Sequence, residues 1–92
     1  MSETRPEAQS LLAFPCDFPM KIMGRKEPGF AQNIVEVVLR HAPDYDPATV
    51  EMRPSRQGNY LSLTVTVRAR SREQLDNLYR ELCDHPQVVM VL

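Results

Sequence analysis

The stretch YLSLTVTVRA, residues 60–69, alternates polar and apolar side chains over its whole length. Successive side chains of a β-strand point to opposite faces of the sheet, so its leucines, valines and Ala69 would share one face. The other face would carry tyrosine, serine, threonine and arginine. We therefore expect a strand in a sheet that has one buried face and one open face.

A helix is predicted directly after this strand. Ser71 and Gln74 have the spacing of a capping box, in which the serine hydroxyl accepts from the third helical N–H and Gln74 reaches back. Apolar residues at helical spacing follow, namely Leu75, Leu78, Tyr79 and Leu82. Pro86 prevents further helix, and the β-branched run 88–92 predicts a final strand.

The N-terminal half is also predicted to form a strand followed by a helix. Phe18, Met20 and Ile22 alternate with other residues in a first strand from about 17 to 23. A helix is expected from about Pro28, which suits a first helical turn, to Ala42, because Pro43 follows. Its apolar stripe comprises Phe30, Ile34, Val37, Val38 and His41.

A second, weaker strand is predicted near residues 50–53, where Val50 and Met52 alternate with charged residues. A polar loop then leads to Gly58 and Asn59, which both tolerate positive φ and can turn the chain back into strand 60–69 as a hairpin.

The order βαββαβ predicts an α+β, ferredoxin-like plait with four antiparallel strands in the order 4-1-3-2 and both helices on one face. Residues 14–92 would form this single domain, and residues 1–13 a flexible arm. The predicted core consists of Phe18, Met20, Ile22, Phe30, Ile34, Val37, Val38, Leu61, Leu63, Val65, Val67, Leu75, Leu78, Tyr79 and Leu82.

The composition narrows the functional classes. A formal net charge of −1 over 92 residues gives no overall field that favours nucleic acid or an anionic membrane. The sequence contains neither a long apolar run nor a basic-then-apolar leader, so we expect a cytoplasmic protein. Cys16 and Cys83 are expected to be reduced thiols. With His41 and His85 they lack the repeated pair spacing of structural zinc sites, so we predict no metal or other cofactor.

One loop is the candidate ligand site: Gly24, Arg25, Lys26, Pro28 and Gly29 precede the first helix. A helix N-terminus has free backbone N–H groups and a positive dipole end, which attract anions. The alternative is a solvated turn whose glycines serve only the backbone angles.

The sequence also bears on two other functional classes, an RNA-binding protein and an enzyme. Arg68, Arg70 and Arg72 are evenly spaced and could form an anion patch or an RNA-binding surface, or else a charged guard at a sheet edge. RNA recognition on such a sheet uses stacking aromatic residues, and Tyr60 is the one candidate on the strong strand. No serine, cysteine or second histidine is spaced to complete a nucleophile–base pair, so we expect no enzyme.

Several motifs resemble those of the YbeD family, small bacterial proteins of unassigned function with an ACT-like plait. The resemblance covers most of residues 14–92 and rests on Phe14-Pro15, Phe18, Lys21, Met23-Gly24, IVEVVLRHAP at 34–43, PSRQGNY at 54–60 and VVMVL at 88–92. Residues 27–30 also resemble the Pro-Gly pair that opens the first helix of ACT domains beside an effector site. The resemblance implies a regulatory or interaction module, and the gene neighbourhood of relatives implies a link to lipoate attachment.

We accordingly expect a non-enzymatic regulatory domain that binds a small anionic ligand or a partner protein, with an RNA-binding plait as the alternative. The last strand is apolar on both faces although the order 4-1-3-2 leaves it at an edge. Unprotected edges pair with other strands, so a homodimer is also predicted.

Overall fold

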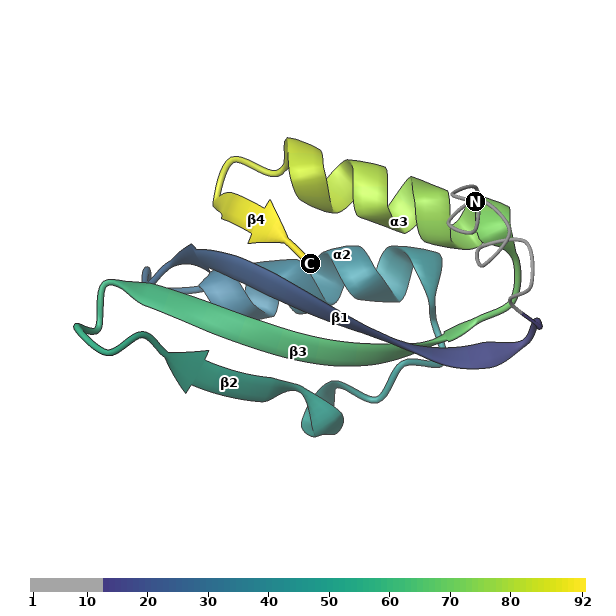
Figure 1. Cartoon of the computed structure of the whole chain (residues 1–92), viewed down its shortest axis with the longest axis horizontal. Helices are drawn as coiled ribbons and strands as arrows, with labels where there is room; N and C mark the ends of the chain where they lie inside the picture. The colour runs from purple at the N-terminus through teal and green to yellow at the C-terminus, as the bar shows by residue number, and fades with distance from the viewer. Residues whose placement is uncertain (1–12) are drawn as a thin grey trace, which may run out of the picture.

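The computed structural model describes residues 13–92, so almost all of the predicted arm lies outside the described residues. The elements follow in the order β1 (Cys16–Arg25), α2 (Phe30–His41), a short 3₁₀ turn (Pro47–Thr49), β2 (Glu51–Pro54), β3 (Tyr60–Ala69), α3 (Arg72–Asp84) and β4 (Val88–Val91). The strands form one antiparallel sheet in the order β2-β3-β1-β4. The predicted plait is therefore confirmed, and α2 and α3 lie on one side of the sheet (Figure 1).

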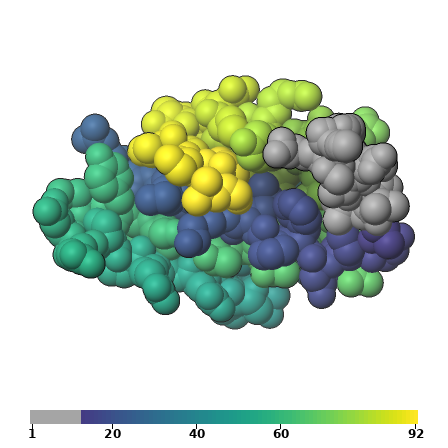
Figure 2. All heavy atoms as spheres, viewed as in Figure 1, coloured from purple at the N-terminus to yellow at the C-terminus, as the bar shows by residue number. Residues whose placement is uncertain are grey.

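The long pairing of β1 with β3 forms the centre of the sheet. It runs from Cys16 opposite Ala69 to Arg25 opposite Tyr60, so β1 extends beyond the predicted range of 17 to 23. Pro19 is tolerated in this strand because its missing N–H lies on the side of β4, whose last backbone hydrogen bonds to β1 are made at Lys21. The open face of this sheet, with β3 (green) between β1 (blue) and β2 (teal), is visible in the space-filling view (Figure 2).

The hydrophobic core fills the space between the sheet and the helices. Most of the predicted core is buried there, and Phe18 and Leu61 are partly buried against it. Tyr79 was predicted wrongly: its side chain is 48% exposed, because α3 buries the narrower stripe of Leu75, Leu78 and Leu82. Tyr45, only 6% exposed, was missed because it lies in a turn without periodicity.

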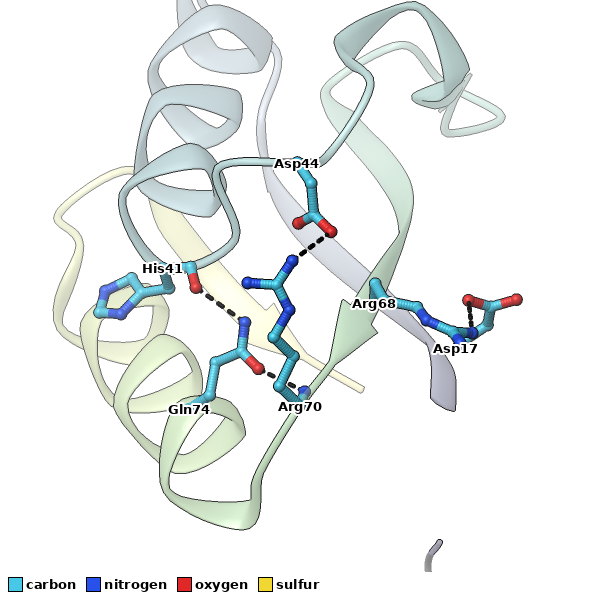
Figure 3. A network of polar contacts seen from close by, with 6 residues as sticks. All are labelled: Asp17, His41, Asp44, Arg68, Arg70 and Gln74. Carbon is cyan, nitrogen blue, oxygen red and sulfur yellow. Dashed lines mark hydrogen bonds and ion pairs between the residues drawn. The ribbon is translucent and has the colours of Figure 1, made fainter. Parts of the chain in front are cut away.

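Polar contacts join the C-terminal end of α2 to the N-terminal end of α3. The Ser71 hydroxyl accepts from the Gln74 backbone N–H at 3.1 Å, as the capping box predicts. The Gln74 side chain does not return to Ser71; it accepts from the Arg70 N–H at 2.6 Å and donates to the His41 carbonyl at 2.8 Å (Figure 3). This hydrogen bond gives the His41 carbonyl a partner, which the last turn of α2 does not provide.

A second contact between the helices involves charged side chains. Glu81 of α3 lies between Arg40, with which it forms an ion pair, and His41, whose Nε2 is 2.6 Å from its Oε1. The hydrogen bonds from Arg40 and then His41 lower the pKa of Glu81 below its ordinary value. His41, predicted as part of the apolar stripe of its helix, therefore also links α2 to α3.

Candidate functional site

The predicted site residues occupy the end of β1 and the loop before α2. Gly24 and Arg25 are the last residues of the strand, and Lys26 begins the loop with a backbone hydrogen bond of 3.0 Å to the Asn59 carbonyl. Arg25, Lys26, Pro28 and Gly29 are exposed, whereas Gly24 is buried. The loop therefore begins fixed to the β2–β3 hairpin.

The N-terminus of α2 has a cap without a side chain. Gly29 is the N-cap residue with φ of 81°, a left-handed conformation that glycine adopts without steric cost. The Phe30 N–H donates to the Glu27 carbonyl at 3.2 Å. The next two N–H groups, those of Ala31 and Gln32, form no hydrogen bond within residues 13–92. These donors lie at the positive end of the helix dipole.

An open hollow lies beside these donors. Its lining residues come from the loop, the first turn of α2 and β3, and they are Lys26, Glu27, Pro28, Gly29, Phe30, Ala31, Gln32 and Leu61. The hollow thus combines one ammonium group, a helix N-terminus, and apolar surface from Pro28 and Leu61. Such an arrangement can hold an oxyanion that carries a carbon chain.

Hydrogen bonds between the side chains of Glu27, Gln87 and Asn33 also fix the loop. Glu27 Oε1 accepts from Gln87 Nε2 at 3.1 Å, and Gln87 Oε1 accepts from Asn33 Nδ2 at 2.8 Å. Gln87 belongs to the turn before β4, so these contacts connect three separate parts of the chain. Periodicity gave no signal for them, because the partners lie 54 and 60 residues apart.

Gly24 has a packing role at this end of the sheet. A Cβ atom there would lie 2.4 Å from the Gln87 carbonyl oxygen and 2.5 Å from two atoms of the Phe30 ring. The absence of a side chain thus lets the turn before β4 and the first turn of α2 approach β1. The structure brings Lys26, Pro28 and Gly29 together around the hollow, and Gly24 and Arg25 do not line it.

The evenly spaced arginines separate in the structure. Arg68 forms an ion pair with Asp17 at 3.1 Å, and Arg70 forms one with Asp44 at 2.9 Å. Figure 3 shows these two guanidinium groups reaching different partners. Because each guanidinium has its own carboxylate partner, the arginines resemble a charged guard at a strand end and do not form one shared anion patch.

The described part of the chain shows neither a cluster of metal-binding side chains nor a membrane-spanning helix. Cys16 and Cys83 are free thiols, and residues 13–92 contain no group of three metal-binding side chains. Over the same range, no helix has the length and apolar character needed to span a bilayer.

Similarity to known sequences covers nearly the whole chain. The profile of a family described as "Protein of unknown function (DUF493)" matches residues 9–92. A UPF0250 protein of Bordetella pertussis is 61% identical over 87 residues, which is 95% of this chain and 96% of the relative. A UPF0250 protein of Nitrosomonas europaea is 55% identical over 84 residues, 91% of this chain and 97% of the relative. These UPF0250 relatives belong to the YbeD family, so the predicted resemblance to that family is confirmed.

Two solved structures share the fold at low sequence identity. The solution structure of a protein from H. pylori has a TM-score of 0.72 at 12% identity, covering 88% of this chain and 85% of that one. The crystal structure of the ACT domain from the GTP pyrophosphokinase of Chlorobium tepidum has a TM-score of 0.57 at 17% identity, covering 84% and 97%. The fold is therefore ACT-like.

Proposed function

Because the chain belongs to the DUF493 family of proteins of unknown function, we propose a function from its own geometry. The protein is a non-catalytic regulatory module that binds a small carboxylate or phosphate compound at the N-terminus of α2. The observation that carries the proposal is that the Lys26 side chain and the N–H groups of Ala31 and Gln32, which have no partner among residues 13–92, lie around one hollow.

The cap residue supports an anionic ligand. Serine, threonine, aspartate or asparagine at an N-cap would satisfy one of the first N–H groups with its own oxygen. Gly29 has no such oxygen, so these donors stay available. An oxyanion there would gain backbone hydrogen bonds, the favourable helix dipole, and the charge of Lys26.

The remaining lining restricts the ligand. Glu27 brings a negative charge to the same hollow, which disfavours a compound that carries several anionic groups in close proximity. Pro28 and Leu61 provide apolar contact for carbon atoms. A single carboxylate or phosphate joined to an amino or apolar part fits this lining. The class includes amino acids and lipoate, and the gene neighbourhood of relatives makes lipoate a specific probe.

The same lining supports a non-catalytic role. No serine, cysteine or histidine side chain is among the described residues around the hollow. A nucleophile activated by an adjacent base is the usual requirement for covalent catalysis. Ligand binding that alters contacts with another protein does not need these groups.

Reversing one charge tests the ligand site. We expect Lys26→Glu to weaken binding of a carboxylate ligand at least about tenfold, equivalent to roughly 1.4 kcal/mol, because it replaces attraction by repulsion. Calorimetric titration with amino acids, lipoate and nucleotides would first identify a ligand and then compare variants. Arg80→Glu on the exposed side of α3 is the control for the same change in net charge. Equal affinity in Lys26→Glu and the unmodified protein would place the ligand elsewhere.

Self-association through β4 is a separate part of the proposal. Val89 and Met90 are 57% and 47% exposed on this edge strand, which has no charged residue. Sedimentation velocity over a range of protein concentrations is expected to show a dimer that Val89→Lys dissociates, since a charge on an edge opposes strand pairing. A monomer at every concentration, with no change in Val89→Lys, would leave β4 without this role.

A further inference from the structure

The open face of the sheet carries a groove along β3. By strand register, Lys21, Thr64 and Glu51 form one row across this face, and the next row contains Met23, Ser62 and Arg53. Two adjoining hollows follow these rows and share Lys21, Arg53 and Ser62 in their linings. In Figure 2 the atoms of β3 (green) lie between those of β1 (blue) and β2 (teal). The helices occupy the other face (Figure 1), so the groove is accessible.

Positive charge is concentrated on this face. Lys21, Arg25 and Arg53 belong to it by register, and none of the three forms an ion pair among residues 13–92. Arg68 and Asp17 lie on the same face but neutralise each other. Among the described residues, Glu51 is the one acidic side chain in the lining of the two hollows. The face is thus cationic although the whole chain has a net charge of −1.

Apolar surface lies at one end of the groove. Met23, Tyr60 and Leu92 line the second hollow together with the two cations, and Tyr60 and Leu92 are 39% and 67% exposed. Ser62 and Thr64 add two hydroxyl groups to the lining of the first hollow. Cations, hydroxyl groups and exposed apolar side chains therefore adjoin one another along a single strand.

We propose that this groove binds an extended segment of a partner protein in which acidic and apolar side chains alternate. Lys21 and Arg53 stand on strands on opposite sides of β3 and in successive rows, so their backbones are about 12 Å apart across the sheet. Alternate side chains of an extended peptide repeat every ~7 Å, and the long lysine and arginine side chains cover the difference. Two carboxylates of one segment would pair with the two cations, while its apolar side chains contact Met23, Tyr60 and Leu92.

The composition of the groove favours a peptide over nucleic acid. Single-stranded RNA is held on such sheets by bases stacked on several aromatic side chains, and Tyr60 is the one aromatic residue of the groove. Glu51 would also repel a phosphate backbone. An acidic segment of a protein can instead place an apolar or hydroxyl side chain against Glu51.

Fluorescence anisotropy with labelled probes tests the proposal. The probes are a peptide of alternating glutamate and leucine, its counterpart of alternating lysine and leucine, and a ten-nucleotide single-stranded uridine RNA. We expect saturable binding of the glutamate peptide that weakens as salt is added. Lys21→Glu and Arg53→Glu should each reduce its affinity about tenfold or more, as expected for a directly paired charge.

Arg80→Glu is the matched control, because it makes the same change in charge on the outer side of α3 and should alter the affinity less than twofold. All four proteins should melt at similar temperatures, since the substituted side chains are exposed. Absence of glutamate-peptide binding, an equal loss of affinity in Arg80→Glu, or tighter binding of the lysine peptide or the RNA would each overturn the proposal.

Discussion

Gly24→Ala is expected to destabilise the protein by about 3 kcal/mol or more, at the upper end of the usual cost of overpacking. The new methyl group would lie 2.4 Å from the backbone carbonyl of Gln87 and 2.5 Å from the Phe30 ring. Phe30 is fully enclosed in the core, and the Gln87 carbonyl belongs to the turn that starts β4. Relief of the clash must therefore move α2 or β4 away from the sheet. Urea denaturation followed by circular dichroism measures this loss.

Gly58→Ala provides the matched control for the same chemical change. Gly58 has φ of 80°, but nothing lies within 4 Å of its Cβ position. Alanine there is expected to cost about 1–2 kcal/mol from the left-handed backbone alone. If Gly24→Ala were no more destabilising than Gly58→Ala, the close approach of α2 and β4 at Gly24 would be wrong.

Leu63→Ala should be the second large effect, with a loss of roughly 2–5 kcal/mol in the free energy of unfolding. Leu63 is completely buried at the middle of β3, opposite Ile22 of β1, and its removal leaves a cavity under the helices. A loss of this size is a large share of the stability of a small domain. The same denaturation experiment measures it.

Leu61→Ala is the control for Leu63→Ala, because it makes the same substitution at a less buried position. Leu61 lies on the same face of the same strand and is only partly buried, so its truncation should cost clearly less than that of Leu63. A change below about 0.5 kcal/mol for Leu63→Ala, as for ordinary surface positions, would mean that the buried face of β3 is misassigned.

The fold was predictable because its strongest signals are local. The alternation in residues 60–69 and the capping serine at Ser71 depend on neighbouring residues, and both are confirmed. Tyr79 was wrongly predicted to belong to the core. Helical spacing places it beside the apolar stripe of α3, but it does not show how much of that helix surface α2 and the sheet cover. Tyr45 was missed because turn residues carry no periodic pattern.

The candidate site was predictable only in its contiguous part. Lys26, Pro28 and Gly29 are close in sequence, and all three line the hollow. The contribution of Gln87 depends on β4 returning beside β1, which places a residue from the end of the chain against the loop. The same tertiary contact explains why Gly24 is a packing residue. The spacing of residues in the sequence predicts neither the contact of Gln87 with the loop nor the packing role of Gly24.

The most direct test of the proposed function is an NMR titration of the ¹⁵N-labelled protein with amino acids, lipoate and inorganic phosphate. We expect saturable shifts of the Ala31 and Gln32 amides with at least one of these compounds, because their N–H groups would acquire an acceptor. Saturable shifts confined to the open sheet face, for example at Ser62 and Thr64, or no saturable shift at the start of α2 with any compound, would contradict it.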